Sequence, residues 1–181
     1  MNTSRLLYRT RQFWQAISTR SSQVDLELIS SILTPSQVSL FNQMQANEQA
    51  HSLRVFRKLT SQEEQNTDLL VAALLHDIGK IRVPLRLWER VLIVIVRVGC
   101  PGCIHKWGSA PSEGSLGWRR TFVVAEQHPQ WGAELAAQCG TSALAVELIS
   151  RHQEQLTPSQ VSGSSMEDSL LRKLQAVDNN S

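Results

Sequence analysis

The sequence predicts an all-α protein: a single helical bundle with a further helix and loop segment around residues 85–119. Apolar residues recur at helical spacing along most of the chain. Serine, threonine and asparagine stand where several of these stretches begin, and glycine or proline marks where others end. A length of 181 residues is enough for one buried core. We expect residues 1–33 to form an N-terminal helical extension and 34–181 to form the main domain.

Capping residues place the first predicted helices. The stretch 1–32 predicts two short helices that are separated near residue 21. Thr34 can cap the next helix, Pro35 suits its first turn, and Gln37 would complete a capping box. We expect this helix to continue to about Leu59.

A buried helix is predicted over residues 68–78, with Asn66 or Thr67 as its cap and Gly79 as its end. Its centre, 69–75, is apolar nearly all round. A helix with no polar face is typical of a protein core.

The segment around residues 85–119 combines two different patterns. Residues 85–98 fit helical spacing, but the β-branched run from Val91 to Val96 also fits a strand. Length and helical surroundings favour a helix, with this run buried. A dimer face or a contact with a membrane surface are the alternatives. Residues 99–117 are rich in glycine, proline and serine, which favours a loop.

The C-terminal part predicts further helices that are each bounded by a cap or a breaker. They are expected over 119–127, from Pro129 to Cys139, from a cap at Ser142 to about Gln153, and from a cap at Ser164 or Ser165 to Asp178, with a loop over 157–165.

Composition and charge exclude several classes of function. With 18 basic and 16 acidic residues, the net charge of +2 gives no electrostatic case for a nucleic-acid partner. The apolar stretch 91–96 is far shorter than the roughly 20 residues that cross a bilayer, so we expect no transmembrane segment.

Three cysteines do not make a disulfide framework in a chain of this length. They favour a reducing compartment, so the expected location is the cytoplasm. Cys100-Pro-Gly-Cys103 followed by His105 is similar to part of a zinc knuckle. It lacks a fourth ligand, and its Pro-Gly centre favours an ordinary turn.

The adjacent residues His76 and Asp77 are the first candidates for chemistry. They stand near the end of the most apolar helix, where a charged carboxylate is costly unless it is paired or binds a metal. Neutral imidazole and carboxylate together suit a divalent transition metal with open positions. The alternative is a histidine at a helix end beside a capping aspartate.

The order His51, His76-Asp77 and Asp178 resembles the HD phosphohydrolase superfamily. In that superfamily a histidine, an adjacent His-Asp pair and a distal aspartate ligate one metal. The matching segments are Ala50-His51-Ser-Leu-Arg-Val, Ala73-Leu-Leu-His-Asp-Ile-Gly-Lys80 and Leu174-Gln-Ala-Val-Asp178. The resemblance covers about residues 35–178 and implies an all-helical domain in which the segment around 85–119 is an insertion.

Two more segments resemble the HD-GYP branch of this superfamily. Glu126-Gln-His-Pro-Gln-Trp-Gly-Ala133 matches one element, and Ile149-Ser-Arg-His-Gln-Glu154 matches another, with Arg151 in place of its first histidine. The resemblance implies that His128 and His152 bind a second metal and that Asp77 bridges the two ions. The Gly-Tyr-Pro signature of the branch is absent after His152, so its cyclic-dinucleotide phosphodiesterase activity is not expected.

The resemblance implies a metal-dependent phosphohydrolase that attacks a phosphate ester or anhydride, in a nucleotide-like substrate, with a metal-activated hydroxide. One or two divalent ions (Fe, Mn, Ni, Co or Zn) are expected per chain. Asp77 and Lys80 are the catalytic candidates. Lys80, Arg54 and Arg151 are the candidates for holding a small phosphorylated substrate, and each has an ordinary surface role as the alternative.

Two other functions remain open from the sequence. A catalytically inactive HD-type signalling module would bind a nucleotide or a protein partner without hydrolysis. A membrane-peripheral regulator would use the apolar run 91–96. The chain also allows a homodimer.

Overall fold

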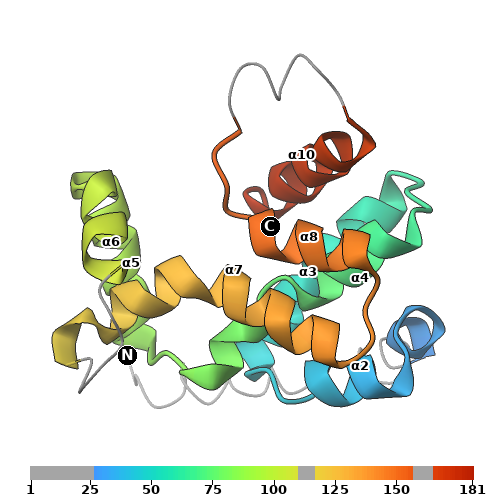
Figure 1. Ribbon diagram of the computed structural model, residues 1–181, viewed down its shortest axis with the longest axis horizontal. Helices are drawn as coiled ribbons and strands as arrows, with labels where there is room; N and C mark the ends of the chain where they lie inside the picture. The colour runs from blue at the N-terminus through green and yellow to red at the C-terminus, as the bar shows by residue number, and fades with distance from the viewer. Residues whose placement is uncertain (1–26, 110–116, 157–164) are drawn as a thin grey trace, which may run out of the picture.

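The computed structural model describes residues 27–109, 117–156 and 165–181, and every regular element in these ranges is a helix. The predicted all-α class is confirmed (Figure 1). Residues 27–32 are helical. The rest of the predicted N-terminal extension, the segment 110–116 and most of the predicted loop 157–165 lie outside the described residues.

The centre of the bundle is α4 (Thr67–Leu75), in which every residue from Leu69 to Leu75 is buried. It packs against α3 (Ala46–Ser61), α8 (Ala143–Arg151) and α10 (Met166–Asp178) (Figure 1). Enclosure on all sides is the arrangement that an all-apolar helix requires. The predicted caps Asn66, Ser142 and Ser165 all accept a hydrogen bond from the first turn of their helices.

The helix predicted from Pro35 to about Leu59 is divided into two in the structure. Thr34 and Gln37 form the expected capping box, but α2 (Pro35–Phe41) ends at Phe41 and α3 begins at Ala46. The chain turns between them, and the Gln49 side chain donates to the Phe41 carbonyl across the turn. The prediction of one helix was wrong because periodicity alone does not show that the turn buries both Phe41 and Met44.

Gly79 does not end the buried helix as predicted. The α-helix stops at Leu75, and the chain tightens into the 3-10 helix η1 (Ile78–Arg82), which passes through Gly79. Any side chain at Gly79 would overlap the carbonyl oxygen of His128 and lie 2.6 Å from the backbone nitrogen of Gly132. The glycine therefore allows η1 to pack directly on α7 (Arg120–Gln138).

Pro129 was expected to begin a new helix, but it lies inside the single helix α7, which follows the short 3-10 turn η2 (Gly117–Arg119). A proline inside a helix removes one backbone hydrogen bond. The helix continues because residues on both sides of Pro129, including Val124 and Ala136, are buried in the protein. Tertiary packing therefore outweighs the local preference.

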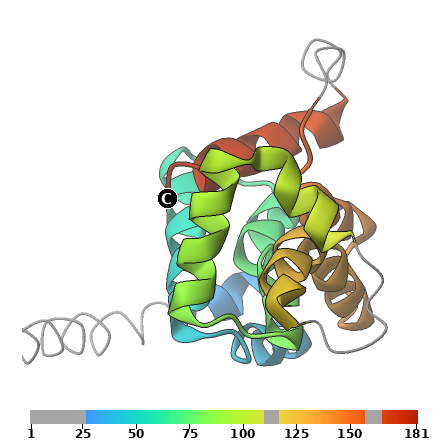
Figure 2. The same cartoon turned by 90° about the vertical axis from the view of Figure 1, so that its left-hand side faces the viewer.

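The inserted segment forms an arm of two helices, α5 (Leu87–Gly99) and α6 (Pro101–Gly108), which stands at one side of the bundle (Figure 2). We call these two helices the arm. The helix predicted over 85–98 is confirmed. The loop predicted over 99–117 is wrong for residues 101–108, which are helical, with Pro101 in the first turn.

The apolar run 91–96 is only partly buried, contrary to the prediction. Leu92, Ile93 and Val96 pack on a small second core, whereas Val94 and Ile95 are both 62% exposed. With Trp88, Val91 and Val98 they give the arm an outward apolar face. One side of α5 packs on the second core, and no described part of the chain covers its other side.

Cys100 and Cys103 are joined by a disulfide at the junction of α5 and α6. The two sulfur atoms are bonded to each other. This pairing removes the support that the cysteines gave to a reducing compartment. Within the described ranges, every helix is too short or too polar to cross a bilayer.

Candidate metal centre

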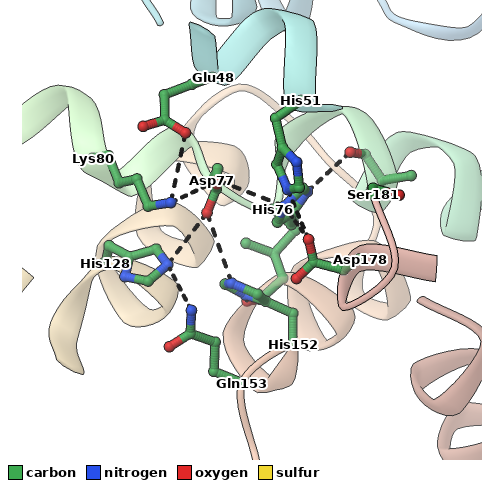
Figure 3. A network of polar contacts seen from close by, with 12 residues as sticks. Glu48, His51, His76, Asp77, Lys80, His128, His152, Gln153, Asp178 and Ser181 are labelled. Atoms are coloured by element: carbon green, nitrogen blue, oxygen red, sulfur yellow. Dashed lines mark hydrogen bonds and ion pairs between the residues drawn. The ribbon is translucent and has the colours of Figure 1, made fainter. Parts of the chain in front are cut away.

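Two groups of potential metal ligands meet beyond the C-terminal end of α4 (Figure 3). The inner group is Asp77, His128 and His152, all buried. The outer group is His51, His76 and Asp178. Within each group, one ligand atom from each residue lies within 4.8 Å of the others. The fold thus brings together all six residues that the sequence singled out as ligands.

Each ligand is placed by the end or middle of a helix. His76 and His152 are the C-cap residues of α4 and α8, and Asp178 is the last residue of α10. His51 and His128 lie within α3 and α7. The helix ends converge because these helices all pack around α4 or η1.

In the inner group, His128 and His152 each direct their Nε2 atom toward the same carboxylate oxygen of Asp77. Nε2 of His128 lies 3.3 Å from Oδ1 of Asp77, and Nε2 of His152 lies 3.9 Å from the same atom. Nδ1 of each ring donates to a carbonyl of its own helix, that of Val124 at 2.8 Å and that of Ile149 at 2.7 Å. These bonds set the tautomer that leaves Nε2 as a lone-pair donor, as in metal-binding histidines.

The outer group is more open and partly bonded to itself. Nε2 of His51 lies 2.7 Å from Oδ1 of Asp178, and both side chains are 21% exposed. His76 is buried, its Nδ1 donates to the Ala73 carbonyl at 3.0 Å, and its Nε2 lies 3.5 Å from the same Asp178 oxygen. The arrangement of His76 therefore resembles that of the inner histidines.

The donor set fits a divalent transition metal. Among the described residues, Nε2 of His76 and Nε2 of His152 have no hydrogen-bond partner although both are buried. An unpartnered buried polar atom is costly, and a bound ion would remove that cost. Imidazole nitrogen with carboxylate oxygen is the ligand chemistry that such ions prefer.

Burial and charge bring the three ligands of the inner group to the protonation states that metal binding needs. Burial lowers the pKa of His152 to about 3 and also lowers the pKa of His128, so both rings are neutral at pH 7. Burial alone would raise the pKa of Asp77, but Lys80 and His76 outweigh it and hold that pKa well below its usual range. Neutral imidazole and ionised carboxylate are the binding forms.

The pKa shifts of His76 and Asp178 follow their pairing in the outer group. Burial opposes the charge of each, but the Asp77 and Asp178 carboxylates raise the pKa of His76, and hydrogen bonds from His51 and His76 lower that of Asp178. In the metal-free protein the two residues therefore behave as an ion pair.

A chain of alternating charges connects Asp77 to the arm. Nζ of Lys80 donates to Oδ2 of Asp77 at 2.7 Å and lies 3.6 Å from Oε2 of Glu48, whose other oxygen contacts Arg90 of α5. Lys80 was one candidate for holding a phosphate. In the structure its charge is matched by two carboxylates, and a substrate role stays a prediction. The sequence did not indicate Arg90, because nothing local shows that α5 returns to the first turn of α3.

The two arginines predicted to contact substrate lie in different surroundings. Arg54 is exposed and forms no hydrogen bond or ion pair with the described part of the chain. Arg151 donates to Glu147 at 2.8 Å, Glu154 at 2.6 Å and Asp168 at 2.7 Å, and these bonds raise its pKa. Arg151 thus joins α8 to α10, and a substrate role for either arginine stays a prediction.

A cleft of about 770 Å³ opens beside the two groups. His152 of the inner group and Asp178 of the outer group line it. The other walls come from the arm, from α7, from the residues after α8 and from the end of α10. The sequence could not reveal this cleft because its walls are far apart along the chain.

Residues 49–179, which are more than half of the chain and contain all six candidate ligands, match the HD domain. The chain therefore belongs to the HD-domain family, whose members are generally metal-dependent phosphohydrolases that bind divalent metals and act on phosphorylated substrates. The match does not assign the chain to the HD-GYP branch. No curated protein and no solved structure matched the chain.

Proposed function

We propose that this chain is a metal-dependent phosphohydrolase that acts on a phosphate ester or anhydride of a small, nucleotide-like substrate. The observation that carries the proposal is the convergence of two neutral, buried imidazoles on one ionised carboxylate beside an open cleft. The catalytic unit would be residues 34–181, with 1–33 as an extension, and the site of action would be the cytoplasm.

We assign His51, His76 and Asp178 to one ion and His128 and His152 to a second, with Asp77 shared between them. The ions would be Fe, Mn, Ni, Co or Zn. When bound, such ions acidify water and polarise phosphoryl oxygens. The chain itself holds the imidazole rings in the binding orientation through their Nδ1–H bonds to helix carbonyls.

Lys80 acts in this proposal through Asp77. Its short bond to Oδ2 of Asp77 keeps the carboxylate ionised and turns Oδ1 toward His128. Glu48 in turn holds the ammonium group of Lys80 in place. The catalytic role expected for Lys80 is therefore that of a positioning residue.

Phosphate release by the purified full chain tests the proposal. Chelator-treated protein is loaded with each candidate metal and incubated with para-nitrophenyl phosphate and a panel of nucleotides. We expect metal-dependent phosphate release and bound ions by elemental analysis. Absence of bound metal together with no turnover under any metal would show that the proposal is wrong.

An inactive signalling module is the second candidate, and the outward apolar face of α5 is the observation that favours it. Trp88, Val91 and Val98 would then contact a protein partner or a second copy of the chain. A nucleotide that raises the melting temperature without being consumed would support this candidate. A membrane-peripheral role requires in addition that the protein float with liposomes.

A further inference from the structure

Ion pairs and a small apolar core attach the arm to the bundle at the edge of the cleft. At its base, Arg120 of α7 donates to Oε1 of Glu89 at 2.8 Å, and Arg90 contacts Glu48. Farther along, Leu92, Ile93 and Val96 pack on a small core formed by Ile104, Phe122 and Ala125. Figure 2 shows α5 and α6 standing in front of the bundle as a connected pair. Any cleft-lining residue of the arm therefore has a defined position.

Arg97 is the only lysine or arginine that lines the cleft within the described ranges. It lies in the last turn of α5, directly after Val96. Its guanidinium group forms no hydrogen bond or ion pair with the residues that the structure describes, and the side chain is exposed. Arg97 is therefore an unmatched positive charge on a wall of the cleft that belongs to the arm.

The other charged residues that line the cleft already have partners. Oε1 of Glu126 lies 2.6 Å from Nδ1 of His105, and Oε2 of Glu154 accepts from Arg151 at 2.6 Å. Asp178 belongs to the outer group of metal ligands. Among the described residues, an anion that enters the cleft thus meets one unmatched cation, which belongs to α5 and not to the helices that hold the metal ligands.

The rest of the lining is rich in uncharged amides. They are Gln153, Gln155, Gln175 and Asn179. Amide side chains offer both donors and acceptors, which suits the uncharged polar part of a nucleotide, such as its base and sugar. The cleft therefore presents a metal-ligand wall, an amide-rich middle and one arginine.

We propose that Arg97 binds a second phosphate group of the substrate, one that is separate from the phosphate that reacts at the metal groups. The inference rests on the proposed function and names its substrate class: a nucleotide that carries two phosphates at separate positions. The planar guanidinium fork of arginine matches a phosphate with two parallel hydrogen bonds. Arg97 is then a specificity-determining residue that the arm supplies.

The test compares two substrates that differ only in the second phosphate. Adenosine monophosphate and an adenosine bisphosphate are hydrolysed by the metal-loaded full chain and by Arg97→Ala, Arg97→Lys and Lys106→Ala. Lys106 is a matched control because it is an exposed cation of the same arm that does not line the cleft. Thermal denaturation confirms that each variant is folded.

We expect Arg97→Ala to raise the KM for the bisphosphate about tenfold or more, the effect of losing a hydrogen bond between charged groups. The KM for the monophosphate should stay unchanged. Arg97→Lys should give an intermediate KM because it keeps the charge but loses the fork, and Lys106→Ala should change neither. An equal change for both substrates, or no change for either, overturns the inference and leaves the proposed function intact.

Calorimetry separates this inference from the proposed function. If no substrate is hydrolysed with any metal, the proposed function fails, and binding of the adenosine bisphosphate still tests Arg97. Binding that is weakened about tenfold by Arg97→Ala and unaffected by Lys106→Ala supports the role of Arg97. Equal binding by the unchanged protein and Arg97→Ala, or no binding by either, overturns it.

Discussion

The inner and outer groups of metal ligands differ in how the protein holds them. The inner histidines are buried, and their ring orientation is set by bonds to helix carbonyls. In the outer group, His51 and Asp178 bond directly to each other and remain partly exposed. An ion entering the outer group must displace that bond, although each group also contains one buried nitrogen without a hydrogen-bond partner among the described residues, Nε2 of His76 and Nε2 of His152. We therefore expect tighter binding and slower exchange at the inner group.

Replacing the shared carboxylate should have the largest effect. Asp77→Asn keeps the shape of the side chain but removes the charge that faces His128, His152 and Lys80. We expect loss of both ions and a fall in phosphate release of more than about 100-fold, the upper range for changes that leave the ligands themselves intact. Elemental analysis and phosphate release measure these effects.

The matched control for that variant is Asp68→Asn, which changes an aspartate at the opposite end of α4. It should retain both ions. If Asp77→Asn bound as much metal as the unchanged protein, the assignment of Asp77 as a shared ligand would be wrong.

Removing one histidine from each group should separate the two ions. His152→Ala is expected to lose the inner ion, and His51→Ala is expected to lose only the outer one, because each ring belongs to one group. The number of ions per chain and their rates of release to a chelator give the comparison. Slower release from the His152→Ala variant than from the His51→Ala variant would reverse our ranking of the two groups.

The contact between η1 and α7 supports the inner group directly, because Asp77 precedes η1 and His128 lies in α7. Gly79→Ala would push the added methyl group into the His128 carbonyl, so we expect a loss of about 3 kcal/mol in the free energy of unfolding. The inner ion should also bind more weakly. Gly99→Ala adds the same methyl group where no atom lies within 4 Å and should not destabilise the protein. Denaturant unfolding compares the two, and equal stability would contradict the packing argument.

Acidification should destabilise the metal-free protein through the inner histidines. His152 in the unfolded chain takes up a proton near its ordinary pKa of about 6.5, whereas in the folded chain its pKa is about 3. The unfolded state therefore binds more protons between these values, and stability falls as pH falls, by about 1 kcal/mol per pH unit for this residue. The raised pKa of His76 has the opposite effect on stability: this residue stabilises the folded protein more as the pH falls.

Thermal unfolding of chelator-treated protein at a series of pH values measures this slope. His152→Asn, which cannot titrate, should give a flatter dependence over the same pH window. A variant with the same slope as the unchanged protein would show that His152 is not the group responsible.

The smallest effect is expected at Arg151, which joins α8 to α10 and so supports the outer group. Arg151→Gln should cost about 1 kcal/mol in the free energy of unfolding, since the side chain is partly exposed. Metal analysis should show a weaker outer ion and an unchanged inner ion. A large rise in KM without a change in stability would instead support the substrate-binding role predicted from the sequence.

Local chemistry explains which helices were predicted correctly. The caps at Thr34, Asn66, Ser142 and Ser165 act through neighbouring backbone groups, so the sequence contains all the information that they need. The errors share another cause. The break before Ala46, the continuation of α7 through Pro129 and the exposed side of α5 all depend on which distant segments pack there.

The sequence by itself determined the helical class, the order of the candidate ligands and the family, because these follow from periodicity, capping and short motifs. Only the tertiary structure decided that Lys80 contacts two carboxylates, that Arg151 forms ion pairs with three carboxylates, and that Arg97 lines the cleft. A side chain's charge is evident from its type. Whether that charge is free to meet a substrate depends on its neighbours in space, and these come from helices that lie far apart in the sequence.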